Sequence, residues 1–203
     1  MATNAQLKEK ALESLKDKWG IAIGGTLLFG VMMAAASFIP FASLIVTGPL
    51  TLGWIYFYLK ISKGEEPQID NLFEGFKKFE NALVLYILES IFIILWMLLL
   101  IVPGIIAAIS YSQAYYIMAE DPNIKPMEAI DKSKAMMDGY KWKYFGLGFH
   151  FFGWFILCLL TVGIGFLWLI PYMTTTFTNF YHDVKGDFKG AVPVSPVLDG
   201  NEY

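Results

Sequence analysis

Residues 81–120, NALVLYILESIFIILWMLLLIVPGIIAAISYSQAYYIMAE, decide the fold class. Their first half, 82–102, holds one charged residue, Glu89, in twenty-one positions. A Pro-Gly pair at 103–104 then interrupts the apolar run before it resumes. Because about 20 apolar residues suffice for a helix to cross the hydrocarbon core of a bilayer, the stretch predicts two membrane spans, 82–102 and 105–119.

The composition favours a bilayer as the surroundings of the chain. Hydrophobic residues make up 56% of the sequence and charged residues 16%, and the mean hydropathy is +0.52. Soluble domains carry about 25% charged residues. The net charge is −3, and all fifteen basic residues are lysines, which lack the planar fork that binds phosphate bidentately. We therefore expect no nucleic-acid partner.

The same unit occurs three times, at a spacing of roughly sixty residues. Each unit consists of an amphipathic helix and two apolar spans joined by a Gly- or Pro-containing turn. The amphipathic helices are predicted at 4–19, 69–79 and 125–140, and the spans at about 21–39, 44–61, 82–102, 105–119, 144–162 and 166–182. These elements predict an all-α polytopic membrane protein with six transmembrane helices, arranged as three helical hairpins that each follow a cytoplasmic amphipathic helix.

The boundaries of this domain are less sharply marked than its helices. The turn of the first hairpin falls somewhere between residues 38 and 49, because Pro40 and the Gly-Pro pair at 48–49 are both able to break the chain. The six-span domain covers residues 1–183. Residues 184–203 contain Gly, Pro and charged residues without periodicity, which predicts a flexible cytoplasmic tail.

The lysines predict how the chain is oriented in the membrane. Residues 1–20 hold four of them, 60–80 hold four, 119–143 hold five, and the segment after 182 holds two. The three turns on the opposite side hold no charge. By the positive-inside rule, both termini and the amphipathic helices are cytoplasmic.

Two ionisable residues within the predicted spans are candidates for function, Glu89 and His150. Intramembrane charges are costly and usually face a protein interior or a water-filled cavity. Glu89 is either a proton- or cation-responsive group, or a structural carboxyl that is kept neutral by burial or hydrogen-bonded to a Tyr or Thr of a neighbouring helix. For His150 a structural role is favoured, since it has no metal-ligand spacing with another His or Cys.

No catalytic chemistry is expected from the sequence. It contains no Gly-rich phosphate loop, catalytic triad or paired-carboxylate site, so we expect no enzyme, no metal and no cofactor. An intramembrane enzyme would require Glu89, His150 and a nucleophile to meet in one pocket.

The second helices of the predicted hairpins turn polar in their cytoplasmic halves, at Tyr111, Gln113, Tyr115, Thr175 and Asn179. In a membrane bundle, hydroxyls and amides find partners in protein or water instead of lipid. One interpretation is a cavity open to the cytoplasm that accommodates a lipid or an amphiphilic peptide. The other is hydrogen bonding between helices, together with an aromatic belt at the interface.

Phe73, Phe76 and Lys77 of the second amphipathic helix offer a different surface. Such a helix binds anionic headgroups, or a membrane or cytoplasmic protein partner. Two functional hypotheses follow: binding or transport-like handling of a lipid or amphiphilic peptide, and a structural scaffold that binds partners.

A series of short motifs runs through the chain in a fixed order. They are ALESLK at 11–16 followed by Trp19-Gly20, GPLTLG at 48–53, NLFEGF at 71–76, LIVPGIIA at 100–107, Tyr111-Ser112, EAIDKS at 128–133, KWK at 141–143, and TVGIG at 161–165 with Trp168 and Pro171-Tyr172. With these motifs the sequence resembles the bacterial integral membrane proteins classed as domain of unknown function 975, over about residues 5–185. The resemblance implies a bacterial cytoplasmic membrane location, mainly in Gram-positive bacteria, and supplies no activity. Glu89 does not belong to the expected family pattern.

Overall fold

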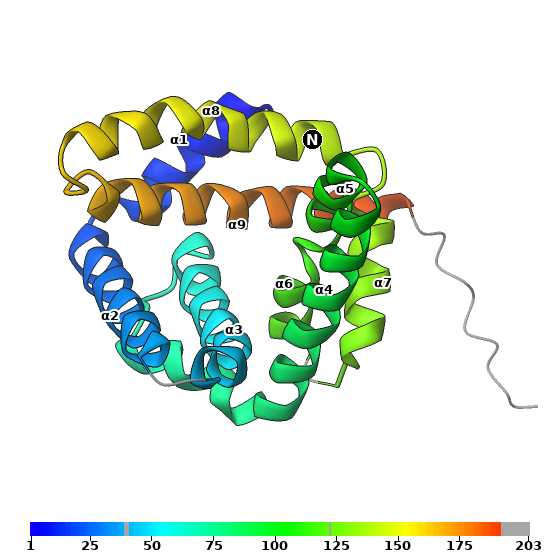
Figure 1. The fold of residues 1–203 in the computed structure, drawn as a ribbon. Coiled ribbons are helices and arrows are strands. Elements are labelled where there is room, and N and C mark those ends of the chain that lie inside the picture. The colour runs from blue at the N-terminus through cyan, green and yellow to red at the C-terminus, as the bar shows by residue number, and fades with distance from the viewer. Residues whose placement is uncertain (39–40, 122, 192–203) are drawn as a thin grey trace, which may run out of the picture.

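In the computed structural model, residues 1–38, 41–121 and 123–191 are described, and all regular structure in these ranges is helical. The elements are α1 (Asn4–Leu15), α2 (Trp19–Ser37), α3 (Ala42–Ser62), η1 (Ile69–Lys78), α4 (Phe79–Leu99), α5 (Ile101–Tyr111), α6 (Ala114–Glu120), α7 (Pro126–Met136), α8 (Lys141–Leu160) and α9 (Phe166–Ala191) (Figure 1). The prediction of an all-α protein is confirmed.

Five helical stretches of the described chain are long and apolar enough to cross a membrane, one fewer than the sequence predicted. They are Trp19–Ser37, Ala42–Ser62, Ile69–Leu99, Ile101–Glu120 and Lys141–Leu160. The sixth predicted span, 166–182, is not among them, because the threonines, Asn179 and His182 of its second half dilute the apolar residues of its first. The helix itself continues to Ala191, and the remainder of the predicted tail lies outside the described residues.

The break in the central hairpin lies three residues before the predicted Pro-Gly pair. Leu100 is extended (φ −161°, ψ 145°) and separates α4 from α5. Pro103 therefore falls in the first turn of α5, where its missing N–H removes no intrahelical hydrogen bond. Gly104 is needed for packing: a Cβ there would lie 2.5 Å from Met97 Cγ.

Helix α2 ends at Ser37 and α3 begins at Ala42, so Gly48 and Pro49 lie inside α3 and do not form the turn. Pro40, the other predicted break, lies outside the described residues. Two other predicted boundaries also shift. The first amphipathic helix ends at Leu15 and Trp19 begins α2, while the third spans Pro126–Met136 instead of 125–140.

The segment predicted as a second amphipathic helix is the 3₁₀ helix η1, which packs backbone against backbone on α3. A Cβ at Gly53 of α3 would lie 1.8 Å from the carbonyl oxygen of Leu72. A Cβ at Gly75 of η1 would lie 1.9 Å from the carbonyl oxygen of Pro49. The GPLTLG and NLFEGF motifs thus pack directly against each other, and Leu72 of the second motif is fully buried.

Helix α1 packs against α9, and both are seen with α8 at the top of Figure 1. A few side chains also connect this end of the chain to α8: Lys143 bonds Ala2, Asn4 approaches Gly146, and Lys8 Nζ lies 2.6 Å from His150 Nε2. The predicted first amphipathic helix therefore packs on the predicted sixth span and touches the fifth.

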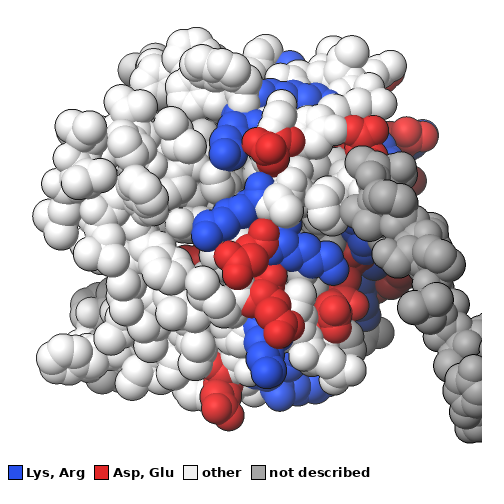
Figure 2. All heavy atoms as spheres, turned by 90° about the vertical axis from the view of Figure 1, so that its right-hand side faces the viewer, with Lys and Arg blue, Asp and Glu red and all other residues white. Residues whose placement is uncertain are grey.

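Charged side chains gather on one face of the molecule. Figure 2 shows lysines and acidic residues in one band there, with an extensive uncharged surface beside it. The largest fully buried side chains include Phe57 and Tyr58 of α3 and Phe180 and Tyr181 of α9. They belong to two buried apolar clusters, one that contains Phe57 and Tyr58 and a larger one that contains Phe180 and Tyr181.

Candidate functional site

The five residues predicted to line a cavity are all buried. Tyr111 ends α5, Gln113 caps α6, Tyr115 lies within α6, and Thr175 and Asn179 belong to α9. The Thr175 hydroxyl donates to the carbonyl oxygen of Pro171 in its own helix, at 2.8 Å. Tyr111 also lines a groove on the surface. All five residues thus lie in the helical interior of the protein, and the cavity and the hydrogen-bonding interpretations both stay predictions.

Several polar atoms in this interior have no hydrogen-bond partner among the described residues. They are Gln113 Oε1, the Tyr115 hydroxyl and both amide atoms of Asn179. An unsatisfied buried polar group costs about 1–3 kcal/mol. Such groups are normally satisfied by ordered water or by a ligand.

The two predicted intramembrane residues lie on different helix pairs. Glu89 of α4 has a buried, unpartnered Oε1 and is close enough to Tyr115 of α6 to interact with it electrostatically. His150 of α8 is exposed and contacts Lys8 of α1. The structure thus gives each residue a different neighbour.

A carboxylate that the sequence did not single out, Glu120 at the end of α6, joins three helix ends. It forms an ion pair with Lys63 at 3.2 Å, a second with Lys185, and accepts a 2.6 Å hydrogen bond from the Tyr181 hydroxyl. Its side chain is 17% exposed, so solvent screens these contacts less than it would on an open surface. The three partners of Glu120 lie far from it along the chain, so no local sequence pattern predicts these contacts.

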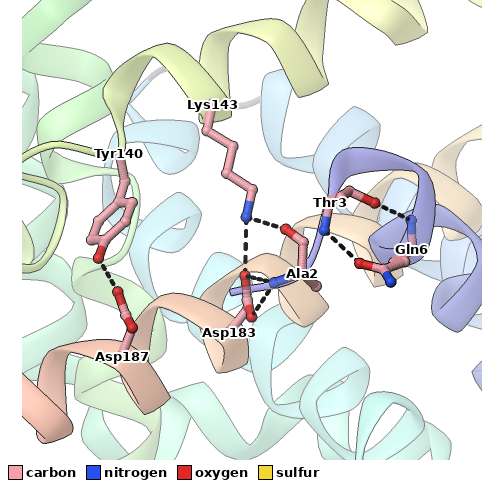
Figure 3. A network of polar contacts seen from close by, with 7 residues as sticks. All are labelled: Ala2, Thr3, Gln6, Tyr140, Lys143, Asp183 and Asp187. Carbon is pink, nitrogen blue, oxygen red and sulfur yellow. Dashed lines mark hydrogen bonds and ion pairs between the residues drawn. The ribbon is translucent and has the colours of Figure 1, made fainter.

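A second polar network ties the N-terminus to the start of α8 and the end of α9 (Figure 3). The Ala2 N–H donates to the Asp183 carboxylate at 2.9 Å, and Lys143 bonds both the Ala2 carbonyl oxygen and Asp183. Nearby, the Tyr140 hydroxyl donates to Asp187, which raises the pKa of that tyrosine. These contacts fasten α1 in place.

Two neighbouring surface grooves lie along α5. The larger, about 530 Å³, runs between α5 and α8, and the smaller, about 370 Å³, extends toward α4 and α7. The larger is lined by Val102, Ile105, Ile106, Ile109, Lys141, Trp142 and Phe145. The smaller is lined by Trp96, Pro103, Ile106, Ala107, Ser110, Tyr111, Lys134 and Lys141. Ile106 and Lys141 belong to both and form the ridge between them.

The charged groups on these grooves are two lysines, Lys134 and Lys141. Lys134 Nζ lies 5.7 Å from the centre of the Tyr111 ring and 3.3 Å from Asp131, in an exposed ion pair. Lys141 forms no ion pair with any acidic residue in the described part of the chain. The grooves thus combine apolar walls with positive charge, a pairing that suits an amphiphile with an anionic end.

The sequence indicates the apolar face of α5 that lines these grooves, but not that this face is exposed. Val102, Ile105, Ile106 and Ile109 follow helical spacing and mark one apolar face of α5. Whether a neighbouring helix covers that face depends on packing between distant segments, and sequence spacing carries no information about it.

The long apolar helices are compatible with a membrane protein, and the comparisons place the chain within one family. The model of the family described as "Protein of unknown function (DUF975)" matches residues 1–110 and 97–187, so the chain belongs to this family, as its motifs indicated. Neither the curated proteins nor the solved structures give a match.

Proposed function

We propose that this is a non-enzymatic integral protein of the bacterial cytoplasmic membrane that binds a lipid or an amphiphilic peptide from the cytoplasmic side. The observation that carries the proposal is the pair of apolar grooves along α5 that meet at Lys141. Apolar walls accommodate an acyl chain or the apolar face of a peptide, while an ammonium group attracts an anionic end.

The orientation supports a cytoplasmic site. The lysines cluster in the segments that contain both termini, η1 and α7, which the positive-inside rule assigns to the cytoplasm. Lys134 and Lys141 belong to one of these clusters. The ligand would then enter from the cytoplasmic leaflet, with its polar end at the membrane surface. Because Val102 and Pro103 line the same grooves, this proposal also puts the turn at residues 100–104 near the cytoplasmic surface, and not on the opposite side as the sequence predicted.

Native mass spectrometry of the protein purified in mild detergent tests this function. We expect a discrete lipid or peptide bound in stoichiometric amount. Ile106 lines both grooves, so the larger side chain of Ile106→Trp narrows them where they meet and removes the bound species. Ile94→Trp, the same change at an exposed position of α4, retains it. A ligand-free native protein, or an Ile106→Trp variant that keeps its ligand, contradicts the proposal.

The alternative is a partner-binding scaffold, and one observation favours it. Phe73, Phe76 and Phe79 form an exposed row on and beside η1, with 6.5 Å between successive ring centres. Lys77 lies next to this row in the sequence. The scaffold hypothesis predicts that changing Phe73, Phe76 and Lys77 to alanine abolishes co-purification of another polypeptide while Glu89→Gln leaves it unchanged. Under the binding hypothesis, the triple variant keeps the ligand.

A further inference from the structure

We infer that the two grooves hold the two acyl chains of one anionic phospholipid, whose phosphate sits between Lys134 and Lys141. This inference rests on the proposed function and specifies its ligand. The grooves share two lining residues, Ile106 and Lys141, and extend from them along two adjoining faces of α5. A ligand with two chains that diverge from one polar end matches this arrangement.

Each groove has the size and chemistry of an acyl-chain site. Their volumes, about 530 and 370 Å³, fall within the range of small-molecule sites, about 300–1,000 Å³. One chain lies against Val102, Ile105 and Ile109, and the other against Trp96, Pro103 and Ala107. A tryptophan borders each groove, Trp96 in one and Trp142 in the other, as is common at the lipid–water boundary.

The charges select the headgroup. Lys141 has no acidic partner in the described residues, and Lys134 pairs with Asp131 in a contact where both side chains are about half exposed. Exposed pairs of this kind are weak, so a phosphate readily replaces Asp131 as the partner of Lys134. A zwitterionic headgroup brings its own cation and gains less from two lysines than an anionic one does.

Titration with defined lipids, followed by native mass spectrometry, tests the inference. The probes are phosphatidylglycerol, phosphatidylcholine and the single-chain form of phosphatidylglycerol. We expect one phosphatidylglycerol per protein, bound about tenfold more tightly than either other lipid. Lys134→Gln with Lys141→Gln abolishes the headgroup preference. Lys132→Gln, at an exposed position of the same helix α7, retains it.

The outcomes separate this inference from the function beneath it. Equal binding of the two headgroups, or an unchanged preference in the double lysine variant, overturns the inference and leaves lipid binding intact. Equal binding of the single-chain form overturns the assignment of two chains. A protein that binds none of the lipids overturns both.

Discussion

Replacing Gly53 or Gly75 with alanine is expected to separate η1 from α3. The new Cβ would lie 1.8 Å from the Leu72 carbonyl oxygen in the first case and 1.9 Å from the Pro49 carbonyl oxygen in the second. Both obstacles are backbone atoms, which no rotamer change moves aside. The two backbones must therefore move apart by roughly 1.5 Å to restore ordinary van der Waals contact.

The cost of this separation follows from the packing. Overpacking of this kind costs about 1–3 kcal/mol, and partial exposure of the fully buried Leu72 adds up to about 1.5–3 kcal/mol. At Gly53, the higher helix propensity of alanine offsets about 1 kcal/mol. We expect a net loss of about 2–4 kcal/mol in the free energy of unfolding, or about 5–15 °C in the unfolding midpoint.

Thermal unfolding in mild detergent, followed by circular dichroism, measures this loss. Gly30→Ala provides the matched control, because Gly30 lies within α2 with no atom within 4 Å of an added Cβ. The control is expected to unfold at the original temperature or slightly above it. A Gly53→Ala protein as stable as the control would refute the close docking of η1 on α3.

Three further predictions concern polar contacts and the aromatic row. Glu120→Gln removes the charge that Lys63, Lys185 and Tyr181 share, and is expected to lower the unfolding free energy by about 1.5–3 kcal/mol. The exposed control Glu66→Gln leaves the unfolding free energy unchanged. Equal unfolding midpoints of the two variants would contradict this. Asp183→Asn loses the ion pair with Lys143 and loosens α1, so trypsin should cut α1 faster than in the wild type, and an unchanged cleavage rate would argue against the network in Figure 3. Phe149 belongs to the exposed aromatic row of α8, with Trp142, Phe145 and Phe152. Phe149→Ser should weaken membrane retention of an isolated α8–α9 hairpin and change the unfolding free energy of the full protein by no more than about 0.5 kcal/mol. A large loss of unfolding free energy would mean that Phe149 packs within the protein.

The features of the fold that sequence predicts here are the local ones. Apolar runs longer than a membrane crossing identify α2, α3, α4 and α8, because length and hydropathy need no knowledge of neighbours. Helix ends were less well predicted. Proline at 103 was taken as a break, yet in the first turn of a helix it fits without loss, and the break fell at Leu100.

Packing between distant segments is where the sequence prediction was incomplete. A hydropathy repeat treats all three hairpins alike, and it cannot reveal that α1 packs on α9. The buried polar residues from Tyr111 to Asn179 were predicted as a group, but their pattern fits a cavity and a packed interior equally. The grooves along α5 were not predicted, because the exposure of Ile105 and Ile106 depends on how α8 packs beside α5.

Photoactivatable phospholipids test the central claim most directly, since they report where a lipid sits on the native protein. The protein is illuminated in membranes that contain anionic lipid with a photoreactive group on one acyl chain, and the adducts are mapped by peptide mass spectrometry. The account predicts adducts concentrated on α5 between Val102 and Ile109 and at Trp142, with loss of these adducts in the Lys134→Gln, Lys141→Gln double variant. Adducts spread evenly over the exposed faces of α2, α4 and α8 would contradict it, because they would show lipid as solvent and no bound ligand.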